Sequence, residues 1–207
     1  SASEPILPAT LDRFAEHMAP SGLRKEALFC AYGLAENMVA VTFPPVLRAP
    51  RVDTVERRIF EAEGRAQPVP EDSHVDALHF VGCGSAVPLH EIRVVDEQGA
   101  PLPDRRQGRL HFRGPSAFKG YYRNPEATAR VKLADGWVDT GDLAYLVAGE
   151  LFITGRVKDL IIKGGKNYYP HEIEAAAGGV SGVRQGCVAA FALRDETAGT
   201  ESIIVVA

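Results

Sequence analysis

Residues 136–174 read GWVDTGDLAYLVAGELFITGRVKDLIIKGGKNYYPHEIE, a stretch in which short apolar runs alternate with tight turns. Apolar runs at 137–138, 143–147 and 151–154 predict three strands, because each is bounded by glycine or polar residues. Residues 148–150 have the length and the glycine of an ordinary hairpin loop. The polar residues gather in the turns, namely Thr140, Asp142, Arg156, Lys158 and Asp159. The stretch therefore predicts a rigid hairpin with polar chemistry at its turns.

A second unit is predicted to begin after Arg156. Residues 160–162 form an apolar run typical of a buried strand, and Gly164 and Gly165 favour a flexible turn. Pro170 suits the first position of a helix, where its missing N–H costs nothing. The polar residues between the hairpin and this strand therefore mark a joint between two units.

TGDL at 140–143 and GRVKDLIIKGGKNYYPHEIE at 155–174 resemble the adenylate-forming superfamily of acyl-CoA synthetases, luciferases and fatty acyl-AMP ligases. The resemblance implies that Asp142 and Arg156 hold the ribose hydroxyls of ATP, and that the joint is a domain hinge at Lys158. It further implies a mixed α/β fold. Residues 1–157 would end a large α/β adenylation domain, with a small distorted β-barrel at about 88–155, and residues 158–207 would start a small α+β C-terminal domain.

YGLAE at 32–36 resembles the YGxTE motif of the same family. The resemblance places Tyr32 and Gly33 at the nucleotide, with the tyrosine on the adenine face, and gives Glu36 the Mg²⁺ that accompanies the triphosphate. An aromatic ring suits base stacking, and a hard cation prefers carboxylate oxygen. Read alone, these residues also fit a turn tyrosine beside a solvated glutamate. Ala35 replaces the usual threonine, as is common in fatty acyl-AMP ligases.

Residues 44–81 are rich in proline and charge. A helix is predicted over 54–63, with Val55, Ile59 and Phe60 on one face and Gly64 at its end. This part of the sequence resembles the inserted segment that fatty acyl-AMP ligases carry and CoA ligases lack. If it is such an insert, the apolar face of its helix is expected to pack on the large domain and to limit the rotation of the small domain. The alternative is a variable surface loop without a role.

Apolar patterns predict further elements along the chain. An amphipathic core helix is expected from an N-cap at Thr10 to Pro20. Strands are expected at 26–31, 91–96 and 109–113, the last with Leu110 and Phe112 inward and His111 outward. A helix at 170–177 and strands at 187–193 and 203–206 complete the pattern, with a turn at 194–200. The aromatic residues of 120–128 are assigned to core and turns.

The 207 residues are 45% hydrophobic and 24% charged with a net charge of −4, which indicates a soluble globular protein and does not favour nucleic-acid binding. No apolar run approaches the roughly 18 residues of a membrane span. The N-terminus lacks the pattern of a signal peptide. Three widely spaced cysteines favour reduced thiols in a cytoplasm over disulfides or a zinc site. The histidines show no metal-ligand spacing.

The resemblance implies an ATP-dependent, AMP-forming ligase that activates a fatty or other carboxylic acid with the aid of Mg²⁺. The acyl group then passes to a thiol. A carrier-protein acceptor is favoured by Ala35 and the insert-like segment, whereas CoA is favoured by the Gly-Gly-Lys-Asn at 164–167. A third reading is an inactive binding module.

The family's phosphate loop and C-terminal catalytic lysine have no counterpart in these residues. The sequence therefore matches the middle-to-late part of such an enzyme, somewhat over a third of it. This part alone is expected to be inactive.

Overall fold

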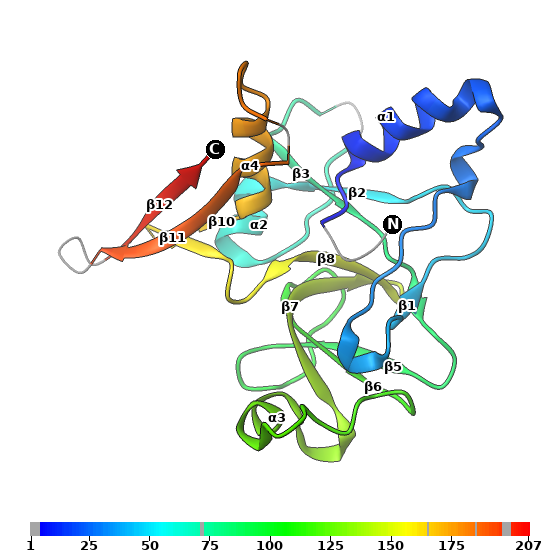
Figure 1. Ribbon diagram of the computed structural model, residues 1–207, viewed down its shortest axis with the longest axis vertical. Coiled ribbons are helices and arrows are strands. Elements are labelled where there is room, and N and C mark those ends of the chain that lie inside the picture. Colours follow the sequence, from blue (N-terminus) through cyan, green and yellow to red (C-terminus); the bar gives the residue numbers. More distant parts are fainter. Residues whose placement is uncertain (1–4, 71–72, 165, 185, 196–199) are drawn as a thin grey trace.

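The protein combines helices with several small antiparallel sheets, a mixed α/β architecture as predicted. The computed structural model describes residues 5–70, 73–164, 166–184, 186–195 and 200–207. Figure 1 shows helix α1 (Pro8–Met18) to the right of the central strands and helix α4 (Pro170–Gly178) to the left. The central strands thus separate the N-terminal helix from the C-terminal unit.

A four-stranded antiparallel sheet with the order β5-β6-β7-β8 forms the centre. Its strands are β5 (Glu91–Val95), β6 (Gly108–Arg113), β7 (Val138–Val147) and β8 (Glu150–Arg156). The runs predicted as separate strands at 137–138 and 143–147 join into β7, whose register shifts between Leu143 and Ala144. A bulge of this kind bends a strand without ending its pairing. The region predicted as a small distorted barrel, about 88–155, contains this sheet. In the described residues its outer strands β5 and β8 are not paired with each other.

The loop between β7 and β8 is one residue shorter than predicted. Val147 pairs directly with Glu150, which leaves Ala148 and Gly149 as the loop. Both have positive φ, 50° and 78°. Two such residues in a row are typical of a type I′ turn, whose twist matches that of the flanking strands. Glu150 is therefore a residue of β8.

Residues 52–81 contain a second antiparallel pair, β2 (Val52–Glu56) and β3 (Ala77–Val81), with helix α2 (Arg57–Glu63) after β2. The predicted helix over 54–63 was wrong in its first turn. Thr54 and Val55 instead lie opposite residues of β3, because β-branched side chains fit a paired strand better than a helix. Gly64 ends α2 as predicted, with φ 61°.

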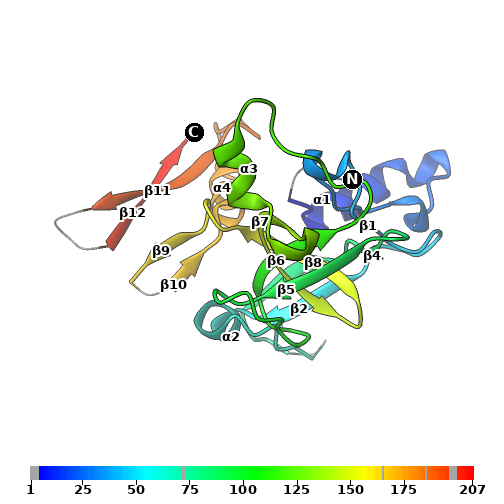
Figure 2. The ribbon, with the colours of Figure 1, turned by 90° about the horizontal axis from the view of Figure 1, so that it is seen from below.

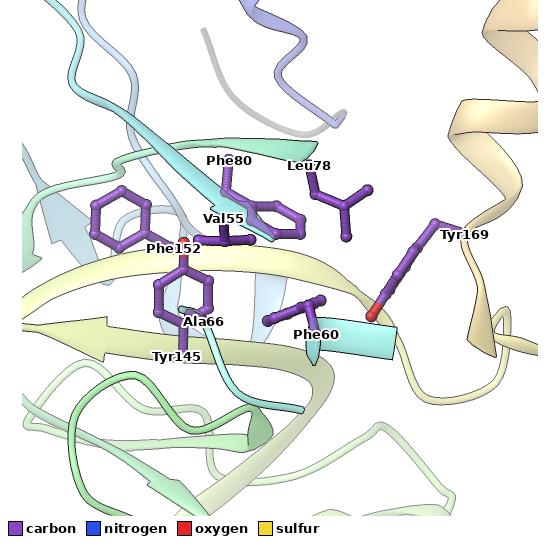
Figure 3. Packing of buried hydrophobic residues seen from close by; sticks show 8 residues of the cluster. All are labelled: Val55, Phe60, Ala66, Leu78, Phe80, Tyr145, Phe152 and Tyr169. Carbon is purple, nitrogen blue, oxygen red and sulfur yellow. The ribbon is translucent and has the colours of Figure 1, made fainter. Parts of the chain in front are cut away.

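Phe60 of α2 lies in the aromatic cluster of Figure 3, between Tyr145 of β7 and Tyr169, which precedes α4. Its ring centroid is 5.1 Å from that of Phe80, 5.9 Å from that of Tyr145 and 6.2 Å from that of Tyr169. Val55 and Phe60 are fully buried and Ile59 is half-buried. The segment is therefore a packed element, as the insert hypothesis requires.

The C-terminal unit consists of α4 and two strand pairs, which Figure 2 shows on the side away from α1. The pairs are β9 (Ile161–Lys163) with β10 (Lys166–Tyr168), and β11 (Ala189–Asp195) with β12 (Thr200–Val206). Pro170 stands in the first turn of α4, as predicted. Gly165 and residues 196–199, which belong to two predicted turns, lie outside the described residues.

Two N-terminal predictions were wrong. The helix predicted before Pro20 is present as α1, but it begins at Pro8 with Leu7 as its N-cap instead of Thr10, because proline at the first position is already in helical geometry. Thr10 is thus inside the helix, none of whose residues is fully buried. In place of the strand at 26–31 there is a 3₁₀ turn (Lys25–Ala27) followed by irregular chain with Cys30 buried. An apolar run predicts burial, whereas a strand also needs a neighbour for its backbone groups.

His111 was predicted to face outward, but its exposed fraction is 4%. It lies on β6 opposite Arg93 of β5 and Asp139 of β7, and the long Arg93 side chain reaches its Nδ1 at 3.5 Å. Burial lowers the pKa of its imidazole. Leu110 and Phe112 are fully buried, as predicted.

Other short elements are β1 (Thr42–Phe43), its partner β4 (Ser85–Ala86), and α3 (Pro125–Val131) with Asn124 as N-cap. Short 3₁₀ helices lie at Ala19–Ser21, Ala35–Asn37 and Ala134–Gly136. Cys30 and Cys83 are buried, Cys187 is exposed, and all three are free. In the part of the chain that the structure describes, no helix has the length and apolar character of a membrane span.

Candidate functional site

Asp142 lies at the meeting point of three segments that are far apart in the sequence. It belongs to β7 and pairs across the sheet with Arg156 of β8, whose Nε donates to Oδ1 at 3.1 Å. The hydroxyl of Tyr32 donates to Oδ2 at 2.5 Å, across 110 residues of sequence. The structure thus brings together Tyr32, Asp142 and Arg156, the three residues that the resemblance assigns to the nucleotide.

The turn before Asp142 is held by side chains of its own residues. The Thr140 hydroxyl donates to the Leu110 carbonyl at 2.9 Å and accepts the Asp142 N–H at 3.0 Å. Gly141 has φ 74°, and its N–H donates to the Asp139 carboxylate at 2.9 Å. A glycine is needed here because the left-handed region is costly for other residues. These bonds fix the direction of the Asp142 side chain.

Asp142 is a buried carboxyl, with an exposed fraction of 5%. Burial raises the pKa of this carboxyl above its ordinary value, and the hydrogen bonds from Tyr32 and Arg156 offset part of that rise. Burial, followed by the neighbouring Asp142 charge, raises the pKa of the Tyr32 hydroxyl well above its ordinary value. Tyr32 therefore acts as a neutral donor to a carboxylate, a short and charge-assisted type of hydrogen bond.

Gly33 follows Tyr32 in a tight loop that returns at Thr42. The N–H of Val41 donates to the Tyr32 carbonyl at 2.9 Å, and an isolated bridge joins Tyr32 to Thr42. A Cβ on Gly33 would lie 1.5 Å from the Val39 carbonyl oxygen. Glycine is therefore required by the backbone of this loop, whatever its relation to a nucleotide.

Glu36 lies in the 3₁₀ turn Ala35–Asn37, four residues after Tyr32, but its carboxylate does not join the Asp142 cluster. The Tyr121 hydroxyl donates to its Oε1 at 2.5 Å, and this bond raises the pKa of Tyr121 to about 12. Sequence reasoning missed Tyr121, which was assigned to core or turn. A tyrosine beside Gly120 in a turn gives no local signal of a partner 85 residues away.

Lys158 is exposed in the turn after β8. The Val157 N–H donates to the Gly141 carbonyl at 2.9 Å, and the Arg156 carbonyl accepts from the N–H groups of Asp159 and Leu160 at 3.2 and 3.1 Å. The turn is thus attached to the loop that carries Asp142. A rearrangement at Lys158 would act directly beside the candidate ribose contacts.

The residues present fit a nucleotide with a bound Mg²⁺. Each carboxylate oxygen has more than one lone pair, so Asp142 can accept ribose hydroxyls beside its present partners. Among the described residues no three His, Cys, Asp or Glu gather as a metal site. Mg²⁺ is commonly held by one or two carboxylates together with phosphates and water, which agrees with a single ligand such as Glu36.

Comparison with known proteins gives a consistent family assignment. The model of the family "AMP-binding enzyme" matches residues 1–122. A putative acyl-CoA synthetase of Caulobacter vibrioides is 41% identical over 90% of this chain and 32% of its own length. The long-chain-fatty-acid–AMP ligase FadD26 of Mycobacterium tuberculosis is 35% identical over 100% of this chain and 36% of its own length.

A solved structure from a study of fatty acyl-adenylate ligases from E. coli and L. pneumophila matches with a TM-score of 0.88 at 36% identity, covering 99% of this chain and 36% of that one. The chain spans about a third of the length of the relatives that it matches. Fold, sequence and family model agree, and the chain belongs to the AMP-binding enzyme family.

Proposed function

We propose that the chain is part of an ATP-dependent ligase that joins a fatty or other carboxylic acid to AMP and then passes the acyl group to a carrier-protein thiol. The observation that carries the proposal is the convergence of Tyr32, Asp142 and Arg156 from three segments. The names of the relatives support acyl-adenylate formation. We also propose that the protein acts in the cytoplasm.

The roles of the residues follow from charge and geometry. Asp142 and Arg156 hold the ribose hydroxyls from two sides, with Arg156 also contacting the Asp142 carboxylate. The Tyr32 ring covers the adenine. Glu36 would hold Mg²⁺, which neutralises phosphate charge when bound. Because both substrates are anionic, positioning and charge neutralisation supply most of the rate enhancement. The chain's own part is to orient the nucleotide.

The division at Lys158 is part of the proposal. Residues 1–157 end a large domain, with the sheet β5–β8 as its smaller subdomain, and residues 158–207 begin a small domain. The hydrogen-bonded turn at 157–160 supports a hinge position. Rotation of the small domain about this hinge would change the surroundings of the site between the adenylation step and the thiol-transfer step.

A CoA-forming ligase is the second candidate. It is favoured by the Gly-Gly-Lys-Asn sequence at 164–167, which resembles that of CoA ligases. A putative acyl-CoA synthetase among the relatives supports it as well. The carrier-protein reading rests on the packed segment 52–64, which contacts both the central strands and the C-terminal unit. Such a contact restrains the C-terminal unit in one pose.

The direct test uses the full-length protein with ATP, Mg²⁺ and a series of fatty acids. Acid-dependent exchange of pyrophosphate into ATP is expected, followed by acyl transfer to a phosphopantetheine carrier protein in preference to CoA. Preferred transfer to CoA would select the second candidate. Absence of exchange with every acid would favour the inactive binding module.

The first prediction concerns the hinge. Lys158→Pro fixes φ and removes a backbone donor, so that the small domain is held near one pose. Adenylation and thiol transfer should then fall unequally, by a ratio of about ten, the effect of roughly 1.4 kcal/mol. Single-turnover measurements of each half-reaction check this. Lys158→Ala is the control, and it should change the rates of both half-reactions little. If Lys158→Pro lowered the two rates by the same factor, Lys158 would not be the hinge.

The second prediction concerns the contact between α2 and α4. The Arg57 guanidinium donates to both oxygens of Glu172, at 2.9 and 2.8 Å. The side chains are 27% and 32% exposed, so the pair is expected to stabilise the observed pose by up to about 1 kcal/mol. Arg57→Ala should therefore raise acyl-CoA formation by roughly threefold to fivefold.

The measurement is acyl-CoA formation at saturating acyl-adenylate, with adenylation measured in parallel. Arg58→Ala is the matched control, because Arg58 is the exposed neighbour on the same helix. Unchanged acyl-CoA formation in the Arg57 variant would show that the pair does not restrain the small domain.

A further inference from the structure

Tyr121 contacts Glu36 from a different part of the chain. Its hydroxyl donates to Glu36 Oε1 at 2.5 Å, and Oε2 accepts no hydrogen bond from a described residue. One carboxylate oxygen of this half-buried residue is thus held, while the other has no donor among the described residues. Such a half-engaged carboxylate is suited to binding one metal ion through its second oxygen.

Tyr121 is itself held by its neighbours. Its N–H donates to the Thr128 hydroxyl at 2.9 Å, and its ring packs edge-on against Phe118 with centroids 4.9 Å apart. The N–H of Phe118 donates to the main-chain carbonyl of Glu36 at 2.7 Å. Residues 118–121 therefore contact Glu36 through both its main chain and its side chain.

We propose that Tyr121 is a positioning residue for the metal ligand Glu36. The proposal rests on the metal role of Glu36 in the proposed function. The tyrosine hydroxyl restricts rotation of the Glu36 side chain and directs Oε2 toward the metal, in the way that outer partners orient metal ligands. A ligand that is held before binding loses less conformational freedom when the ion arrives.

The test measures Mn²⁺ binding by electron paramagnetic resonance, in the full-length protein with a non-hydrolysable ATP analogue. Tyr121→Phe keeps the ring and its contact with Phe118 and removes the hydroxyl alone. The Mn²⁺ dissociation constant should rise roughly tenfold to a hundredfold, the loss that removal of an outer partner of a metal ligand typically causes. The KM for the metal should rise while kcat at saturating metal changes little.

Two further variants make the result specific. Tyr122→Phe is the control, because Tyr122 is the adjacent tyrosine and is 84% exposed; its Mn²⁺ affinity should equal that of the unmodified protein. Glu36→Gln should weaken Mn²⁺ binding more than Tyr121→Phe does. Tyr121→Phe added to Glu36→Gln should have little further effect, because the two residues act through one carboxylate.

The outcomes separate the two hypotheses. Unchanged Mn²⁺ affinity in Tyr121→Phe, with weakened binding in Glu36→Gln, would overturn the role of Tyr121 alone. So would an equal loss from Tyr121→Phe in both backgrounds, since the effect would not pass through Glu36. Unchanged affinity in Glu36→Gln would overturn the metal role of Glu36 and the inference that depends on it.

Discussion

Asp142→Ala is expected to lower kcat/KM for ATP in the full-length enzyme by roughly a hundredfold or more. A carboxylate that accepts two ribose hydroxyls makes hydrogen bonds of about 1.5–3 kcal/mol each, and roughly 1.4 kcal/mol corresponds to a factor of ten. The variant also leaves the buried Tyr32 hydroxyl without its acceptor. Pyrophosphate exchange at varied ATP concentration measures the effect.

The Asp142→Asn variant is the control for this experiment. It keeps the shape of the side chain and an oxygen acceptor, but it removes the charge that the Arg156 Nε contacts at 3.1 Å. Its activity should lie between those of the alanine variant and the unmodified enzyme, with a melting temperature closer to the latter. Wild-type ATP kinetics in Asp142→Ala would show that this residue is not the ribose ligand.

Phe60→Ala is expected to lower the free energy of unfolding by about 3–5 kcal/mol. The ring is fully buried among Phe80, Tyr145 and Tyr169, so its removal leaves a cavity lined by three large rings (Figure 3). Urea unfolding of the full-length protein gives the measurement. Because Tyr169 precedes α4, the variant should also loosen the contact between the central strands and the C-terminal unit.

Phe60→Leu is the matched control, since it keeps most of the apolar volume, and a loss of about 1–1.5 kcal/mol is expected. If Phe60→Ala unfolded at the same urea concentration as the unmodified protein, the packed position of α2 would be wrong. The restraint on the C-terminal unit would then lose its main physical support. The substitution is preferable to deletion of 52–70, because deletion would also remove β2 from its partner β3.

Local sequence determined the elements whose signals lie within a few residues. The β7–β8 hairpin was predicted from two apolar runs around a glycine, and the start of α4 from Pro170. Gly64 at the end of α2 is a signal of the same kind. In each case the backbone preference of one residue or dipeptide decides the geometry. The motif residues of the family were likewise readable along the chain.

Tertiary structure decided what depends on a partner far along the chain. Residues 54–56 pair with β3 instead of starting a helix, and residues 28–31 are irregular despite their apolar pattern. The contact of Tyr121 with Glu36 spans 85 residues, and that of Tyr32 with Asp142 spans 110. Hydrogen bonds and strand pairing need two groups within about 3 Å of one another, and only the packed chain brings such distant residues together.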